Sequence, residues 1–497
     1  MGRINFTRLC GLNHIIEYNI YDKHNLRNQL QSFNIHAHFY QPPREDPFTG
    51  IIPIESGAAP FINWNERIHS ECYRPNAELG NFERIGYNIG PTLFEWMAAY
   101  DPIASQRIVA QDRANIDRYG VGNAIAQPYH HTILPLATRY DKKTQIVWGI
   151  EQFKHRFGRK PQGMWLPETA VDEESLITLV DQGIEFTILA PWQAEDDNLD
   201  VTEPYRVRLP EGREITVFFY HGWLSGKVSF DPMATMNADQ FVRLHLKPHF
   251  RPEKIQRGEP QLLMIASDGE LYGHHQSLRD HFLAHLVNGA ASQESLATTF
   301  PALWLREHPA RQSVKIRERT SWSCIHGVAR WVGSCSCVPG NQGWKSHLRH
   351  ALDRFSQQLD VLYHTAVSPF VKDPWALRDD YIRVLLGLQP VEDLIAQASG
   401  KRLPEEICVR IQILLESQLE RQKMYASCGW FFEDFERIEP RNSVAYAAKA
   451  LHLTNRATGV DLAPELMANL EKVVSSRAGL RGDQLLNDYL SRSVRSK

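Results

Sequence analysis

Two acidic segments of the chain have the residue types and the setting for acid–base or nucleophilic chemistry. In "GMWLPETAVD", Glu168 follows Trp-Leu-Pro, and Pro167 favours an extended conformation at Leu166. In "LLMIASDGELYGHH", Asp268 and Glu270 follow an apolar run typical of a buried parallel strand. Active sites of α/β proteins usually lie at the carboxyl ends of strands. Glu168 and Asp268 are therefore candidates for a catalytic pair.

Two carboxyl groups from two strands suit glycoside hydrolysis. One group protonates the leaving oxygen, and the other attacks the anomeric carbon or helps water to attack it. A separation of about 5–5.5 Å gives retention of configuration through a covalent intermediate, and a wider gap gives inversion. Taken singly, a carboxylate at a strand end is more often a helix cap or a member of an ion pair. Residue types alone leave both interpretations open.

A histidine pair lies in "IHAHFYQPPRED". His36 and His38 are two residues apart on an expected strand, so both rings point to one face. Neutral imidazoles in this arrangement suit Zn²⁺ and similar ions. Alternatively, the rings hydrogen-bond sugar hydroxyls and tune nearby carboxylates, or one ring is buried and bonded to the backbone while the other is exposed.

A cysteine-rich segment, "CIHGVARWVGSCSC", could supply four ligands for structural zinc. These are Cys324, His326, Cys335 and Cys337. Their spacing matches no standard zinc finger, and short Cys-x-Cys runs also occur as buried thiols, which is the favoured interpretation. For the flanking Trp322 and Trp331 we expect core packing, with sugar stacking as the alternative.

The elements that must position these residues alternate between strand and helix. Strand-like runs are "NIHAHF", "RIGYNIG", "NAIAQPYHHTILPL", "GMWLPE", "EFTILA", "ITVFFYHG" and "QLLMIASDGE". "KTQIVWGIEQFKHRFG" has helical spacing with Gly158 as a stop, and a Pro- and Asn-rich loop is expected to about residue 80. The alternation predicts an α/β protein with a parallel sheet, open or closed into a barrel.

The pattern changes at about residue 340. From there, amphipathic helical segments such as "KSHLRHALDRFSQQLDVLYHTAV" follow one another without a convincing strand between them. We therefore expect a poorly patterned N-terminal extension over residues 1–30, a catalytic α/β region over 31–340 and an α-helical domain over 341–497.

Composition narrows the function classes. With 55 basic and 58 acidic residues the net charge is −3, which gives no electrostatic reason to expect nucleic acid or a membrane surface as a partner. No apolar run approaches the ~20 residues needed to span a bilayer. The seven cysteines are irregularly spaced, and the first 30 residues lack the apolar stretch of a signal peptide. A reducing, cytoplasmic setting is expected. Oligomeric state is not readable.

Four segments together resemble glycoside hydrolase family 57, in its bacterial branch that carries an additional domain of unknown function. They are "HAHFYQPPR", "AQPYHHTILPL", "GMWLPETAVD" and "ASDGELYGHH", in the family's order and approximate spacing. "TSWSCIHGVARWVGSCSC" and "SCGWFFEDFERIEP" are similar to signatures of that branch. The resemblance implies a distorted (β/α)7 barrel followed by a helical region, a retaining mechanism and an α-glucan-type oligo- or polysaccharide substrate, without a cofactor. Members of the branch tend to be longer, which favours a chain shortened at its C-terminus.

The resemblance also assigns roles. Glu168 matches the family nucleophile and Asp268 the general acid/base, so Asp268 is expected to be protonated, its pKa raised by burial and by the charge of Glu168. His36 and His38 match the histidines that line the subsite of the sugar to be cleaved. Matching motifs that help to shape this subsite contain the remaining residues His131, Trp165 and Glu270.

The chain also departs from the family pattern. Phe39 and Tyr40 separate His38 from Gln41, and the second motif lacks the Glu that it often carries. The choice between hydrolysis and glycosyl transfer, and the substrate preference, therefore stay open. Two other functions compete. One is a metal-dependent hydrolase, of the polysaccharide deacetylase or phosphoesterase type, with His36, His38 and Asp268 as ligands. The other is a non-catalytic carbohydrate-binding protein.

Overall fold

A computed structural model describes residues 30–495, so the extension expected over residues 1–30 lies outside it except for its last residue. Within the described part, strands occur between residues 31 and 313, and the segment from residue 343 onward is built from helices. The strands are β1 Gln31–Phe39, β2 Gly86–Ile89, β3 Phe186–Leu189, β4 Tyr205–Arg208, β5 Glu214–Phe219, β6 Gln261–Asp268, β7 Ala297–Thr298 and β8 Gln312–Ser313.

The strands close into a parallel barrel with seven positions. β1 pairs with β2 on one side and with β6 on the other, and β3 pairs with β5, all in parallel. Two short segments complete the circle through single parallel bridges: Tyr87–Ala124 and Ala126–Met164 connect β2 to residues 124–126 and 163–165, and Gly163–Phe186 leads on to β3. The order is thus β1, β2, 124–126, 163–165, β3, β5 and β6.

The barrel is distorted where β5 meets β6. β4 pairs antiparallel with β5 from Glu214 to Val217, on the edge opposite β3. At the end of β5 the backbone N–H of His221 then donates to the carbonyl of Met264 on β6, at 2.7 Å. β4, which the sequence pattern did not predict, is therefore inserted beside the barrel wall at this point.

Side chains along each strand alternate between the barrel interior and the apolar layer under the helices. Phe33, Ile35, Ala37 and Phe39 of β1 belong to the apolar cluster shared with the surrounding helices. On β6 the alternate residues Leu262, Met264 and Ala266 pack inside, with Trp165 and Phe186. Because side chains alternate with a period of two, Asp268 continues the inner face of β6 at its carboxyl end.

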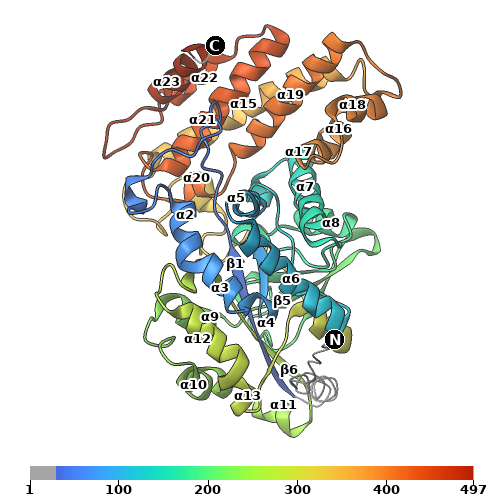
Figure 1. Cartoon of the computed structure of the whole chain (residues 1–497), viewed down its shortest axis with the longest axis vertical. Helices are drawn as coiled ribbons and strands as arrows, with labels where there is room; N and C mark the ends of the chain where they lie inside the picture. Colours follow the sequence, from blue (N-terminus) through green and yellow to red (C-terminus); the bar gives the residue numbers. More distant parts are fainter. Residues whose placement is uncertain (1–29, 496–497) are drawn as a thin grey trace, which may run out of the picture.

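Helices surround the barrel and then form the second region. Around the barrel they are α2 Trp64–Ile68, α3 Arg74–Glu78, α4 Asn81–Arg84, α5 Pro91–Tyr100, α6 Pro102–Tyr119, α7 Arg139–Phe157, α8 Glu173–Asp181, α9 Gly222–Phe230, α10 Ala238–Gln240, α11 Pro252–Gln256, α12 Arg279–His285, α13 Ala291–Gln293 and α14 Pro301–Glu307. The helical region contains α15 Gly343–Val367, α16 Pro374–Asp380, α17 Ile382–Leu385, α18 Val391–Ser399, α19 Glu405–Lys423, α20 Cys428–Phe431, α21 Ile438–Thr458, α22 Ala463–Leu470 and α23 Gly482–Arg495. Figure 1 shows the helices of this region, orange to red, gathered at one end of the molecule.

The prediction of a loop up to about residue 80 is wrong over its second part. Residues 64–78 are helical, because the polar residues there serve the helices: the side chain of Asn63 caps α2, accepting from the backbone N–H of Glu66 at 3.0 Å, and Pro75 lies in the first turn of α3. The helix predicted before Gly158 is confirmed as α7, and Gly158 ends it in the left-handed conformation.

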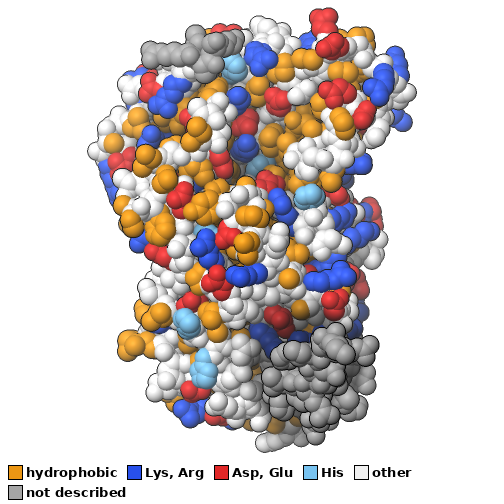
Figure 2. Space-filling model, viewed as in Figure 1, with side chains coloured by type: hydrophobic (Ala, Val, Ile, Leu, Met, Phe, Trp, Pro, Cys, Tyr) orange, Lys and Arg blue, Asp and Glu red, His pale blue; other side chains and the backbone are white. Residues whose placement is uncertain are grey.

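Basic and acidic side chains are interspersed over the face shown in Figure 2. Among the described residues, none of the helices combines the length and apolar character that crossing a bilayer requires.

Candidate active site

Glu168 lies in a strained turn just beyond the bridge segment 163–165. The turn Pro167–Thr169 places both Glu168 (φ 57°) and Thr169 (φ 46°) in the left-handed region. For residues with a Cβ this conformation costs roughly 1–2 kcal/mol each. Gln193 holds the turn: its amide nitrogen donates to the Thr169 carbonyl and its amide oxygen accepts from the Thr169 hydroxyl, both at 2.8 Å. A residue with a strained backbone that its surroundings hold in place is typical of a functional site.

The carboxylate of Glu168 is bound by a segment that is distant in sequence. The indole Nε1 of Trp322 and the hydroxyl of Ser323 donate to the same oxygen, Oε2, at 2.9 and 2.7 Å. The backbone N–H of Trp322 also donates to the Glu168 carbonyl. Burial raises the pKa of Glu168, and these two side-chain hydrogen bonds and the charge of Arg330 oppose the rise. The donors therefore favour the ionised form.

The environment of Asp268 favours the protonated form of its carboxyl group. In the strand register its Cα pairs with that of His38, so the carboxyl group projects beside the histidine pair. Desolvation by the surrounding protein, followed by the charges of Glu270 and Glu168, raises the pKa of Asp268 to about 8. The side chain nevertheless has exposed surface, so water partly screens these charges.

The charge of Glu168 reaches the carboxyl group of Asp268. The charge of Glu168 contributes to the raised pKa of Asp268, so the two groups lie within electrostatic reach. Glu168 accepts two hydrogen bonds that stabilise its anion, whereas the influences on Asp268 all favour its protonated form. The two environments therefore favour a proton on Asp268 over a proton on Glu168.

The predicted histidine pair is buried beside Trp165. The rings of His36 and His38 stack on Trp165, with centroids 5.0 and 5.1 Å away. Asn88 of β2 bonds to both, at 3.1 Å from His36 Nε2 and 2.8 Å from His38 Nδ1. Burial lowers the pKa of His36 to about 4 and that of His38 to about 3. Both rings are thus neutral near pH 7 and act through hydrogen bonds.

His131 joins this cluster from the other side. Its Nε2 lies 3.1 Å from Nε2 of His38, and its ring stacks on Tyr40 at 3.9 Å. Its Nδ1 lies 2.6 Å from the hydroxyl of Ser427, which belongs to the helical region. Two further segments therefore fix the orientation of the imidazoles: β2, with Asn88, and the signature "SCGWFFEDFERIEP", which begins at Ser427.

Glu270 lies behind Asp268 and is almost entirely buried. Its Oε1 accepts from the hydroxyl of Tyr73 at 2.7 Å and from the backbone N–H of Tyr40 at 3.1 Å. Burial raises its pKa to about 7, against these hydrogen bonds. Glu270 is therefore a group whose charge changes near neutrality and acts directly on Asp268.

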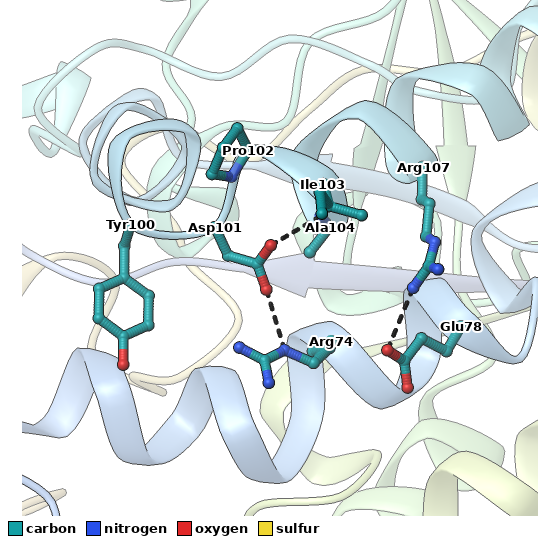
Figure 3. Close-up of a pocket in the computed structure, with 8 residues that line it drawn as sticks. All are labelled: Arg74, Glu78, Tyr100, Asp101, Pro102, Ile103, Ala104 and Arg107. Atoms are coloured by element: carbon teal, nitrogen blue, oxygen red, sulfur yellow. Dashed lines mark hydrogen bonds and ion pairs between the residues drawn. The ribbon is translucent and has the colours of Figure 1, made fainter.

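The geometry does not favour the metal-dependent alternative. Within the described residues, the one group of three or more His, Cys, Asp or Glu side chains with converging ligand atoms consists of Cys324, His326, Cys335 and Cys337. His36, His38 and Asp268 are not such a group. The surface pocket drawn in Figure 3 contains none of the predicted site residues, and its charges pair with one another, Arg74 with Asp101 and Arg107 with Glu78.

Comparison with protein families assigns two parts of the chain. Residues 110–317 match glycosyl hydrolase family 57, and residues 340–486 match a domain of unknown function, DUF3536. The chain carries a glycosyl hydrolase family 57 domain. The match confirms the resemblance seen in the sequence and makes the chain an enzyme of the glycoside hydrolase type. None of the curated proteins matches the chain.

Solved structures share the fold of the family 57 domain and its helical region. An exo-type maltose-forming amylase from Pyrococcus sp. ST04 aligns with a TM-score of 0.73 at 15% identity, over 89% of this chain and 83% of that one. A GH57-type branching enzyme from Pyrococcus horikoshii aligns with a TM-score of 0.58 at 16% identity, over 93% and 94%. A 4-alpha-glucanotransferase from Thermococcus litoralis aligns with a TM-score of 0.55 at 15% identity, over 86% and 60%. These alignments confirm the predicted barrel with its helical extension.

The predicted site residues interact with one another: the charges of Glu270 and Glu168 both act on Asp268, and the histidine rings stack on Trp165. His36 and Trp165 have no exposed surface, and His131 has 1%. The sequence pattern missed Asn88, Ser323 and Ser427. Trp331 is core, as expected, but Trp322 is half-buried and binds Glu168. The signatures that begin "TSWSCIHG" and "SCGWFFED" are signals for Ser323 and Ser427, because both segments carry the family resemblance.

Proposed function

We propose that Glu168 is the nucleophile and Asp268 the general acid/base of a retaining enzyme that acts on α-glucan-type carbohydrate. The observation that carries this assignment is the division of protons between them: donors stabilise the anion of Glu168, and that anion raises the pKa of Asp268. A retaining glycosidase needs this unequal pair.

In the first step, the ionised Glu168 attacks the anomeric carbon while Asp268 gives its proton to the leaving glycosidic oxygen. The product is a glycosyl ester of Glu168. Loss of the Glu168 charge lowers the pKa of Asp268, which is then an effective base. In the second step Asp268 takes a proton from water or an acceptor sugar, the new oxygen attacks the anomeric carbon, and Glu168 leaves as a carboxylate.

Neutral imidazoles suit the reacting sugar. We infer that His36, His38 and His131 orient the sugar hydroxyls or the carboxyl groups through hydrogen bonds, with Trp165 as the rigid surface behind them. Because these imidazoles are uncharged, the charges near the reacting bond are set by the three carboxyl groups of Glu168, Asp268 and Glu270.

Exposed indoles support a carbohydrate substrate longer than one sugar. Trp192 follows β3 and Trp223 follows β5, both at the carboxyl ends of barrel strands, and they are 47% and 48% exposed. Flat aromatic rings at such positions stack on sugar faces. The names of the similar structures, an amylase, a branching enzyme and a glucanotransferase, support α-glucan as the substrate class, with either water or a sugar as the acceptor.

Chemical rescue tests the two assignments separately. With an activated α-glucosyl substrate, Glu168→Ala should lose essentially all turnover, and added azide should restore it by forming the β-glycosyl azide. Asp268→Ala should form the covalent intermediate from a substrate with a good leaving group, and azide should then give the α-glycosyl azide. Exposed Glu173→Ala, on the neighbouring helix α8, is the control and should turn over like wild type.

Trapping gives the direct observation. A fluorinated α-glucosyl inhibitor that forms a slow covalent intermediate should label the peptide containing Glu168, as measured by mass spectrometry after digestion. Labelling elsewhere, or near wild-type turnover by Glu168→Ala with an unchanged circular dichroism spectrum, would refute the proposal. No labelling and no turnover on any glucan would favour a non-catalytic carbohydrate-binding protein.

We further propose a reducing, cytoplasmic location. None of the six cysteines in the described residues forms a disulfide, which is the expected state in that compartment. Fractionation of the native host with an antibody to the chain tests this location.

A further inference from the structure

Three thiols and one imidazole converge in the segment that carries the partners of Glu168. Sγ of Cys324 lies 3.5 Å from Sγ of Cys335 and 3.8 Å from Sγ of Cys337. Nδ1 of His326 lies 3.2 Å from Sγ of Cys335 and 3.5 Å from Sγ of Cys337. All four atoms lie within 4.8 Å of one another, although the residues span two separate turns.

These separations match four of the six edges of a metal-centred tetrahedron. Zinc bonds of about 2.3 Å to sulfur and about 2.0–2.1 Å to nitrogen place tetrahedral ligands roughly 3.8 Å apart for two sulfurs and roughly 3.5 Å apart for sulfur and nitrogen. The four measured distances fall close to these values. A disulfide requires about 2.05 Å between sulfurs, so the pair Cys324 and Cys335 is not one.

We propose that Cys324, His326, Cys335 and Cys337 bind one zinc ion in a closed, structural site. Four protein ligands complete the tetrahedral coordination and leave no open position for water, so the ion would hold the chain together and take no part in the reaction. On binding, each of the three thiols releases its proton to the solvent and coordinates as a thiolate. The site revises the expectation of buried free thiols.

Two short turns explain how so unusual a spacing can converge. The backbone N–H of Gly327 donates to the Cys324 carbonyl, and that of Val338 donates to the Cys335 carbonyl, both at 3.1 Å. Each turn carries two ligands that are two residues apart. Gly327 has φ +74°, and a Cβ there would overlap the Arg319 carbonyl oxygen, so this turn requires glycine.

A buried cation beside the cluster is an independent observation. Lys345 has no exposed surface, and its Nζ has no hydrogen-bond partner. Its charge interacts with Cys324 and Cys335. A buried ammonium group is costly, and the net charge of −1 on three thiolates around Zn²⁺ would add to the charge of Glu433 in balancing Lys345.

The site would act on catalysis through position. Trp322 and Ser323, which donate to Oε2 of Glu168, immediately precede the ligand Cys324. A metal ion that fixes Cys324 would hold both donors against the carboxylate. Zinc binding does not depend on the proposed function, and only this consequence for Glu168 rests on it.

Metal content is the primary test. Wild-type protein without an affinity tag, purified under reducing conditions and dialysed against metal-free buffer, should contain about one zinc ion per chain by mass spectrometry of the elements. Cys335→Ser should lose most of it. Cys408→Ser, in helix α19 and outside the cluster, is the matched control and should keep the full content. Wild type with no more zinc than Cys335→Ser would overturn the proposal.

Cobalt provides a readout that is independent of activity and of variant folding. Wild-type protein stripped of metal and titrated with Co²⁺ should develop the intense visible bands of tetrahedral cobalt with thiolate ligands, saturating at about one equivalent. Zinc should bleach them. Weak octahedral bands, or no thiolate–cobalt bands in the fully reduced protein, would contradict the site.

The positional role has its own measurement. Removal of zinc should lower kcat more than it raises KM and should shift the acidic limb of the rate profile, because the donors to Glu168 are no longer fixed. If metal is present and its removal leaves the profile unchanged, the site is structural without an effect on Glu168. If metal is present and no glucan is turned over, the proposed function fails while the metal site stands.

Discussion

The ring of His131 lies 2.6 Å from the hydroxyl of Ser427, measured from Nδ1 to Oγ. The two residues are 296 positions apart, and they join the histidine cluster of the barrel to the helical region. The backbone supports the same contact, because the N–H of Ser427 donates to the His131 carbonyl at 3.0 Å and Thr132 forms an antiparallel bridge with Ala426. The helical region thus completes the site and is more than an attachment to it.

Ser427→Ala should lower kcat about fivefold, because loss of one side-chain hydrogen bond costs about 1 kcal/mol and releases the His131 ring. Steady-state kinetics on the best glucan substrate measure the effect. Ser399→Ala, on helix α18, is the control and should leave kcat unchanged. A Ser427→Ala enzyme with wild-type kcat would mean that the contact only joins the two regions.

Ser323→Ala should move the acidic limb of kcat/KM to higher pH. The Ser323 hydroxyl lowers the pKa of Glu168 by stabilising its anion, so its removal raises that pKa and the active, ionised form appears only at higher pH. A pH series with wild type and the exposed control Ser346→Ala measures the shift. A limb that moves downward, or does not move, would contradict the assignment of that limb to Glu168.

Glu270→Gln should move the basic limb to lower pH. Activity requires protonated Asp268 and falls as pH rises through its pKa of about 8; the charge of Glu270 is the largest charge effect behind that value. Its removal lowers the pKa of Asp268, so the acid is lost earlier. The same pH series records the shift, with exposed Glu253→Gln as control. An unchanged basic limb would exclude Asp268 as the group that titrates there.

Trp192→Ala should raise KM for long oligosaccharides about fivefold with little change in kcat, which is the loss of about 1 kcal/mol of stacking away from the reacting bond. Trp192→Phe should recover part of the affinity. The measurement is KM as a function of chain length, since a short substrate that does not reach Trp192 should show no effect. Equal losses for all lengths would place the indole outside the proposed role.

Gly149→Ala should destabilise the fold by about 1–3 kcal/mol, because a Cβ at this buried position of α7 would overlap the Gln127 carbonyl oxygen. Gly226→Ala, in α9, meets no atom within 4 Å and should stabilise by up to about 1 kcal/mol through helix propensity. Thermal unfolding followed by circular dichroism compares the two. A stable Gly149→Ala variant would show that α7 can move away from the barrel.

Secondary structure was easiest to predict where the residues of a segment have a single structural role. β6 could be predicted from its apolar run, β1 from the strand-like run "NIHAHF", and the carboxylates at strand ends from their position. The segment 64–78 was misjudged, because Asn63 and Pro75 are turn residues in a loop but start signals for a helix. Ser323 and Ser427 could not be singled out by type, because many hydroxyl groups are equivalent until folding brings one of them to a carboxylate or an imidazole.

The contact between His131 and Ser427 can form only after a delay during translation. At about 5–20 residues per second, the 296 positions that separate the two side chains take roughly 15–60 s to translate. Trp322 and Ser323 emerge within that interval, and Ser427 emerges after all of the barrel strands. A nascent chain can therefore form most of its barrel well before its histidine cluster is complete, and the capacity for turnover arises only after Ser427 has been made.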